Sequence, residues 1–310
     1  MAAPTFLPLD DVRYGTAEQM SPLIRRVIAE NPSKFTYRGT GTYVVGHGDV
    51  VVIDPGPRLD AHREALEAAL EGERVRAILV THCHSDHSPL AAWLREQTGA
   101  PTIAFGPHPR PAPGTDPIEP PDDDVEIEES TDYDFRPDVA AADGDVIDVV
   151  PGATFTAVHT PGHTSNHMCW ALGEESALFT GDHVMGWSTT VVSPPDGDMA
   201  AYIDSLRRVA GRNDTVLWPT HGPPRRDAET YVTALIEHRL ERERGVLAQV
   251  RAGRSTIPEI VEVLYADVRA ELHKPAGRSV WAHLEHLVDQ GLVGFDGADR
   301  PMLDGTYRPC

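Results

Sequence analysis

One short stretch decides how the rest of the chain is interpreted, and it reads Thr81-His82-Cys83-His84-Ser85-Asp86-His87. It contains three imidazoles and one carboxylate, all of them metal-binding side chains, and it directly follows the apolar run 75–80. Side chains of an extended chain alternate between two sides, so His82 and His84 face the same way and Cys83 faces the other. Such a density of ligands after a buried strand has little structural use and predicts a metal site.

Three later segments also place metal-binding side chains after short apolar runs. His163 follows the run 153–157 through a Pro-Gly turn, which redirects the chain. Asp182 and His221 follow further strand-like runs in the same manner. Because loops carry chemistry while strands hold them in place, we expect all four segments to meet at one edge of a layered fold.

The order of predicted elements supports such a layered arrangement. A Gly-His-Gly turn joins two strand-like runs, and helical segments follow them. A further helix between Asp182 and His221 carries its apolar residues on one face. In chain order we expect strands at 42–45 and 50–53 and helices at 61–70, 90–96 and around 202–209.

In content and order these segments resemble the metallo-beta-lactamase superfamily, over about the first three quarters of the chain. The resemblance implies an α/β layered fold, the αββα sandwich, and two bound zinc ions. Zinc suits a set of imidazoles and carboxylates, although iron or manganese could occupy similar ligands. The resemblance also implies three ligands for each metal and one bridging carboxylate: His82, His84 and His163; Asp86, His87 and His221; and Asp182.

Two metals on such a set favour hydrolysis. With the two aspartates and a hydroxide they leave a formal charge of about +1, which attracts an oxyanion. A metal lowers the pKa of a bound water to about 7, so we expect a metal-bound hydroxide to attack an ester-type bond. Asp86 is expected to be the main catalytic side chain, because it can also accept a hydrogen bond from that hydroxide and orient it.

Three more histidines lie near these ligands in the sequence. His159 and His167 each stand four residues from His163, and His183 directly follows Asp182. Each is either a support that orients a ligand or an ordinary packed or exposed residue, and the sequence leaves the choice open.

Two aromatic residues are expected in the substrate pocket. Trp187 and Tyr202 both follow Asp182, and their proximity to this ligand is the only ground for the expectation.

Composition agrees with an intracellular enzyme. The 310 residues are enough for one large domain and one small one, and the three cysteines are too few and too scattered for a disulfide framework. The first residues lack a signal-peptide pattern, and no apolar run approaches the roughly 18 residues of a membrane span. We therefore expect a cytoplasmic protein with no membrane contact.

Residues 107–138 depart from the layered pattern. They are rich in proline, and residues 116–138 carry 11 acidic side chains against one arginine in a chain of net charge −21. This composition predicts a solvated, partly mobile insertion. A lid over the site is the alternative, because the insertion lies between the first ligand cluster and His163.

The C-terminal part has a different character. It contains a charged helix at 235–248, a capping-box start at Thr256-Ile257-Pro258-Glu259 and a third helix that ends before Gly291. A short strand at 292–295 and a turn follow. Helices followed by a short hairpin predict a small winged-helix-like domain at 231–310, after a catalytic domain at 1–230. Together the two resemble the lactamase-beta-like branch of the superfamily, which includes a mitochondrial endoribonuclease.

Three functions remain open on this reasoning. We favour hydrolysis of a small acyl substrate such as a thioester or lactone, because a net charge of −21 leaves little basic surface for phosphates. An endoribonuclease acting on single-stranded RNA is the alternative, supported by the winged helix. A metal-sensing DNA-binding regulator is the third. The expected recognition helix has few basic residues, so we expect this domain to be a structural cap or a homodimer contact.

Overall fold

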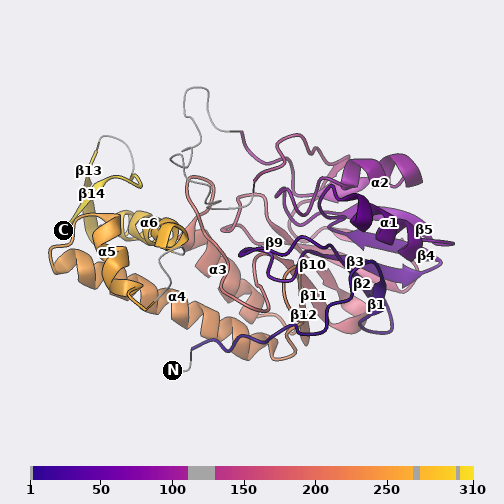
Figure 1. Cartoon of the computed structure of the whole chain (residues 1–310), viewed down its shortest axis with the longest axis horizontal. Helices are drawn as coiled ribbons and strands as arrows, with labels where there is room; N and C mark the ends of the chain where they lie inside the picture. Colours follow the sequence, from indigo (N-terminus) through magenta and orange to yellow (C-terminus); the bar gives the residue numbers. More distant parts are fainter. Residues whose placement is uncertain (1–2, 111–129, 268–272, 298–300) are drawn as a thin grey trace.

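Two sheets packed face to face form the larger part of the molecule (Figure 1). The computed structural model describes residues 3–110, 130–267, 273–297 and 301–310. The first sheet runs in sequence order through seven strands: β1 (Ala17–Gln19), β2 (Ile24–Ile28), β3 (Gly41–His47), β4 (Asp49–Ile53), β5 (Arg74–Leu79), β6 (Thr102–Ala104) and β7 (Val139–Ala140). The second has the order β12 (Val216–Pro219), β11 (Ala177–Gly181), β10 (Met168–Leu172), β9 (Ala153–His159) and β8 (Val146–Val150), with a short 3₁₀ helix η1 (Gly173–Glu175) after β10.

Both faces of the central strands are buried. In β4, Val51 and Ile53 contribute to the core between the sheets, whereas Val50 and Val52 contribute to the core on the outer face. This alternation is the period of two expected of a strand, and burial on both sides explains why β4 is apolar at successive positions.

Helices cover the outer face of each sheet and complete an αββα sandwich. On the first sheet lie α1 (Asp60–Ala69) and α2 (Ala91–Thr98), whose buried residues share cores with β2, β3 and β4. On the second lie α3 (Met199–Ala210) and α4 (Ala228–Arg251), which pack against β9, β10 and β11. The predicted fold class is confirmed, and the predicted early strands and helices match within a few residues.

The ligand-bearing segments leave the sheets at strand ends. The motif at 81–87 follows β5, and Asp182 and His221 follow the parallel pair β11 and β12. Because β4 and β5 are also parallel, their carboxyl ends lie at a common edge of the first sheet. The segments that carry the predicted ligands therefore begin at this edge and at the ends of β11 and β12.

A small helical domain with a two-stranded hairpin follows, in agreement with the predicted winged helix. It contains α5 (Ile257–Leu264), α6 (His273–Asp289) and the antiparallel strands β13 (Val293–Asp296) and β14 (Thr306–Pro309). The capping box of Thr256 and Glu259 is present at the start of α5. No helix in the described ranges is long and apolar enough to cross a membrane.

Helix α4 belongs to both parts of the molecule and runs from the sandwich to the C-terminal helices (Figure 1). Its residues Val232 and Leu235 lie in the core with α3, whereas Val246 and Val250 lie in the core with α5 and α6. The predicted division between residues 230 and 231 therefore falls within the first turn of a helix that both cores share.

The acidic insertion is described only at its ends. Residues 111–129, on which the choice between a mobile loop and a lid depends, lie outside the described residues. Residues 130–138 lie against the ligand motif: Asp132 N donates to Cys83 O at 2.7 Å, and Ser85 N donates to Ser130 O at 2.8 Å. Phe135 is buried, whereas Ser130, Asp134, Arg136 and Asp138 are exposed. The backbone of this stretch thus pairs with the ligand motif, and the solvated, partly mobile insertion stays a prediction.

Candidate metal centre

The first predicted ligand group comes together around His84. The Nδ1 atom of His84 lies 3.0 Å from His82 Nε2 and 3.2 Å from His163 Nε2. His82 and His84 therefore do face the same side of the extended segment after β5, and His163 reaches them from the loop after β9. Cys83 points the other way, into the outer core, as the alternation predicts.

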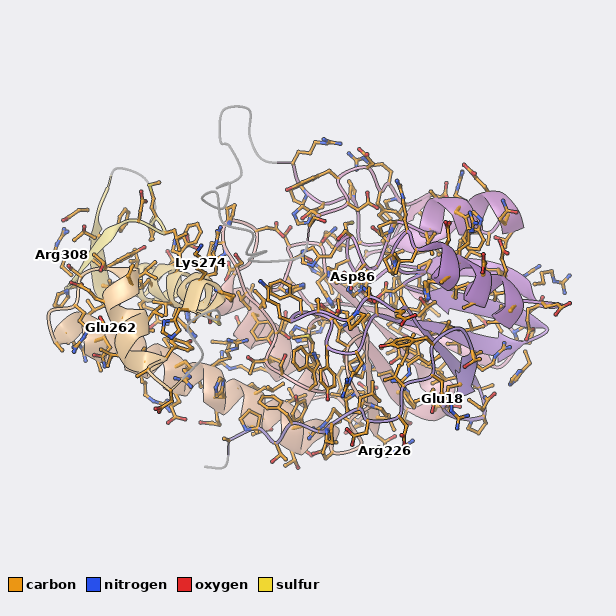
Figure 2. The ribbon with its side chains drawn as sticks, viewed as in Figure 1. Glu18, Asp86, Arg226, Glu262, Lys274 and Arg308 are labelled. Atoms are coloured by element: carbon orange, nitrogen blue, oxygen red, sulfur yellow. The ribbon has the colours of Figure 1, made fainter. Side chains whose placement is uncertain are left out.

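The second predicted group lies beside the first. Asp86 Oδ2 is 3.3 Å from His87 Nε2 and 3.2 Å from His221 Nε2. Asp182 lies between the groups, with Oδ1 3.4 Å from His221 Nε2 and Oδ2 4.0 Å from His163 Nε2. The structure thus collects all seven predicted ligands in one place, near the centre of the molecule where Asp86 is labelled (Figure 2).

Backbone carbonyls determine how two of these rings are oriented. His163 Nδ1 lies 2.7 Å from Val191 O, and His221 Nδ1 lies 3.2 Å from Gly39 O. Because a carbonyl oxygen only accepts, Nδ1 of each ring carries a proton, and Nε2 faces the cluster.

Asp54 orients a third ring, and the sequence analysis did not identify it. Its carboxylate accepts from the backbone N and from Oγ1 of Thr81, both at 2.7 Å, and lies 2.9 Å from His87 Nδ1. This contact directs His87 Nε2 toward the cluster. The sequence contained a usable signal, because Asp54 follows the buried strand β4 just as Asp182 follows β11.

The segment before β3 supplies further support that the sequence analysis missed. Thr40 Oγ1 donates to Asp86 Oδ2 at 2.6 Å, and the neighbouring Gly39 provides the carbonyl for His221. Nothing local in the sequence marks these residues, because their role depends on the packing of β3 against segments far along the chain.

The donor set fits divalent metals. Ring nitrogens of five imidazoles and the oxygens of two carboxylates converge in a buried space, where uncompensated polar atoms are costly. His87 Nε2 and His221 Nε2 have no hydrogen-bond partner among the described residues. A divalent cation bound there would satisfy these atoms together, and a mixture of imidazole nitrogen and carboxylate oxygen is a set that zinc accepts.

The first two histidines of the ligand motif differ from His87 in their electrostatics. Burial and the neighbouring imidazoles hold the pKa of His82 and of His84 well below the usual value. Burial also lowers the pKa of His87, but the surrounding carboxylates, led by Asp86, outweigh it and raise this pKa to about 9. His82 and His84 are therefore neutral at physiological pH, the form in which imidazole binds a metal.

The three histidines predicted as supports have different surroundings. His167 Nε2 accepts a hydrogen bond from Asp182 N at 3.2 Å, so it does lie against a predicted ligand. The His183 ring is fully buried, with centroid distances of 6.0 Å to His167 and 5.1 Å to Tyr202. His159 instead stacks on Phe105, with centroids 4.0 Å apart. Its Nε2 lies 3.1 Å from Ser165 O, in the loop that carries His163, so the support role of His159 stays a prediction.

The two predicted pocket residues also differ. Trp187 is partly exposed and stacks on Tyr37, with ring centroids 4.7 Å apart, so it can still line a pocket. Tyr202 is fully buried on the inner face of α3, and its hydroxyl donates to His183 O at 3.0 Å. The pocket role of Tyr202 is wrong, because helical packing leaves none of its surface open to a ligand.

Comparison with known families agrees with this fold and site. Residues 37–221 match the metallo-beta-lactamase superfamily, and residues 256–300 match the beta-lactamase associated winged helix domain. The chain therefore belongs to the metallo-beta-lactamase superfamily, and it is a hydrolase of that superfamily.

Curated relatives extend the similarity over most of the chain. This chain is 32% identical over 306 residues to the lactamase-like protein adaB of Aspergillus niger, and the alignment covers 92% of this chain and 86% of the relative. It is 31% identical over 304 residues to the atrochrysone carboxyl ACP thioesterase AgnL7 of Paecilomyces divaricatus, covering 93% and 85%.

Solved structures share the whole fold. A beta-lactamase domain protein from Burkholderia ambifaria aligns with a TM-score of 0.75 at 22% identity, covering 98% of this chain and 97% of that one. A metallo-beta-lactamase family protein from Thermus thermophilus aligns with a TM-score of 0.73 at 23% identity, covering 94% and 100%. These alignments include the C-terminal domain as well as the sandwich.

Proposed function

We propose that this protein hydrolyses an acyl thioester, breaking the bond between the acyl carbon and sulfur, with two zinc ions as cofactors. The observation that carries the proposal is the convergence of seven nitrogen- and oxygen-donating side chains in one buried site. Relatives named as thioesterases, at 30% and 31% identity over at least 90% of this chain, support the thioester as the substrate class.

The proposed ligands form two groups joined by Asp182. The first is the trio of imidazoles around His84, and the second combines Asp86 with His87 and His221. Two divalent ions bound there would polarise the acyl carbonyl and activate a water at neutral pH.

Asp86 is the proposed catalytic residue. The Thr40 hydroxyl holds one oxygen of its carboxylate at 2.6 Å, between the Nε2 atoms of His87 and His221. This arrangement fixes the plane of the carboxylate, so it can accept a proton from the attacking water in a defined direction. Because Asp86 and its two neighbours are buried, bulk water does not compete for that proton.

The leaving group also favours a thioester. A free thiol has a pKa of about 8.5, so a departing thiolate needs no strong acid beside the sulfur. A phosphodiester substrate would need phosphate contacts, and a chain with a net charge of −21 opposes them. Trp187, stacked on Tyr37 near the cluster, is the proposed wall for the acyl group.

The test is a turnover panel with zinc-loaded protein. Acyl thioesters of N-acetylcysteamine and coenzyme A, the matched oxygen esters, a lactone and single-stranded RNA are compared. Thiol release is followed with a chromogenic disulfide reagent in a Cys310→Ser background, because Cys310 is exposed while the other two cysteines are buried. We expect thioester turnover that falls about 10²–10⁴-fold in Asp86→Asn.

The matched control is Asp204→Asn, which changes a carboxylate that is 74% exposed on α3. It should leave thioester turnover unchanged. RNA cleavage that Asp86→Asn abolishes, in a protein inactive on every thioester, would instead establish the endoribonuclease alternative and refute the proposal.

A further inference from the structure

The segment of residues 183–198, between β11 and α3, contacts the metal centre at two points. The carbonyl of Val191 accepts from His163 Nδ1 at 2.7 Å, and the hydroxyl of Thr190 donates to Asp182 O at 2.7 Å. The orientation of two proposed ligands therefore depends on where residues 190 and 191 lie.

This segment is held in turn by side chains from the C-terminal helices. Two donors lie on α4 and one on α6, and their acceptors are backbone carbonyls spaced along the segment. The three bonds are Tyr231 OH to Met185 O at 2.8 Å, Arg239 Nη2 to Thr190 O, and Arg278 Nη1 to Pro194 O at 3.4 Å.

Arg239 is the donor closest to the centre along this route. Its side chain is almost fully buried, with its guanidinium 5.3 Å from the ring centroid of Tyr202 and its Nη1 3.5 Å from Ser279 Oγ. Burying a guanidinium costs free energy that neutral acceptors repay only in part, so an apolar residue would serve simple packing better. The guanidinium of Arg239 is planar and has several donors in fixed directions, so it can hold a backbone carbonyl in one position.

We propose that Arg239 is a positioning residue of the metal centre. By fixing the carbonyl of Thr190, it places the Thr190 hydroxyl on Asp182 and the Val191 carbonyl on His163. Helix α4, which also belongs to the core of the C-terminal domain, thus helps to build the site. This inference rests on the proposed function only for the assignment of Asp182 and His163 as ligands.

Arg242 provides a matched control within the same helix. Its guanidinium lies 5.0 Å from the ring centroid of Tyr265, and its Nη1 donates to Leu264 O at 3.1 Å. Arg242 is only partly buried, but its contacts, an aromatic ring and a backbone carbonyl, are of the same kind as those of Arg239. They lie within the C-terminal domain and do not involve residues 183–198.

The experiment compares Arg239→Met with Arg242→Met in the full chain. Zinc dissociation constants are measured by competition with a chromophoric chelator, and the free energy of unfolding is measured on the metal-free proteins. We expect Arg239→Met to bind zinc about 10–100-fold more weakly, the usual effect of losing a group that orients ligands. Arg242→Met should retain wild-type zinc affinity, whatever its effect on unfolding. Equal zinc affinities for both variants and the wild type would overturn the inference.

Two further variants cover the case in which Arg239→Met does not fold. Arg239→Lys keeps the charge but loses the planar fork, and we expect an affinity between those of the wild type and Arg239→Met. Thr190→Val removes the hydroxyl bonded to Asp182 O and should weaken zinc binding in the same direction. Wild-type affinity in both of these variants would also overturn the inference.

The zinc measurement needs no substrate, so it separates this inference from the proposed function. A wild-type protein that hydrolyses no thioester would refute the function and leave the result on Arg239 standing. A wild-type thioesterase with unchanged zinc affinity in the Arg239 variants would refute the inference alone.

Discussion

Asp54 shows how a single buried carboxylate organises several proposed ligands. It is 1% exposed and joins three strand ends, because it follows β4, accepts from Thr81 after β5 and lies 3.3 Å from the hydroxyl of Thr220 after β12. Its contact with His87 Nδ1 also determines which nitrogen of that ring faces the cluster. Asp54 touches no proposed metal position itself, yet its charge and geometry act on the ligands through the residues it holds.

We expect Asp54→Asn to weaken zinc binding by about 10–100-fold. The backbone of Asp54 has a φ of 49°, in the left-handed region that asparagine tolerates well, so the variant removes charge without adding backbone strain. Chelator competition measures the affinity, and circular dichroism checks the fold. Asp204→Asn on the exposed face of α3 is the control, and an Asp54→Asn protein with wild-type affinity would contradict the expectation.

At the residue scale the sequence marked the proposed ligands more clearly than the residues that orient them. The seven proposed ligands were recognisable because each stands in a dense motif or within a few residues of the end of an apolar strand, both of which are local features. Thr40 and the carbonyls of Gly39 and Val191 carry no such mark, since any residue has a carbonyl and only the folded chain determines which one meets a histidine.

At the scale of elements, α1 secures the turn that follows β4. His62 of α1 is buried, and its Nε2 lies 2.9 Å from Thr42 Oγ1 and 3.1 Å from Pro55 O. Gly56 has a φ of 95°, and a Cβ there would lie 2.7 Å from His62 Nε2, so the turn has room for the ring only because glycine stands at this position. The turn begins at Asp54, so α1 indirectly steadies the site.

His62 should make the protein sensitive to acid. Burial lowers its pKa from 6.5 to about 4, so the unfolded chain binds a proton at this residue before the folded chain does. The contribution of His62 to the free energy of unfolding is at its full value above pH 6.5. It is lost as the pH falls from 6.5 to about 4. The free energy of unfolding of His62→Gln should therefore depend less steeply on pH in this window than that of the wild type. Urea denaturation at several pH values measures both, and parallel curves would contradict this explanation.

Helices were predicted well where the sequence carries a capping motif or apolar residues that recur at the helical period. The capping box marked the start of α5, and the apolar face of α6 was visible in the sequence. Helix α4 was predicted to be shorter than its 24 residues, because its buried face changes partners along its length and the apolar pattern is correspondingly weak. Tyr202 was misplaced because proximity in sequence does not reveal which way a side chain points on a helix.

At the scale of the whole molecule, a net charge of −21 acts on stability as well as on partners. Self-repulsion of so many carboxylates favours the expanded chain, and salt screens it. We expect the melting temperature of the metal-free protein to rise between about 0.01 and 0.2 M sodium chloride, over which the Debye length falls from about 30 Å to below 10 Å.

Choline chloride at matched ionic strength distinguishes screening from binding of a particular ion. Both salts should raise the melting temperature by similar amounts. A melting temperature that stays constant or falls with either salt would show that local ion pairs outweigh the overall repulsion.

The sharing of α4 between the two cores has a consequence for biosynthesis. The last proposed ligand, His221, precedes α4, whereas Arg239 and Arg278, which hold the segment at 183–198, come later in a chain of 310 residues. A nascent chain thus carries every proposed ligand well before it carries the side chains that hold two of them in place. We therefore expect a product truncated between residues 221 and 239 to keep all seven proposed ligands, to lack both arginines and to bind zinc more weakly than the 310-residue chain.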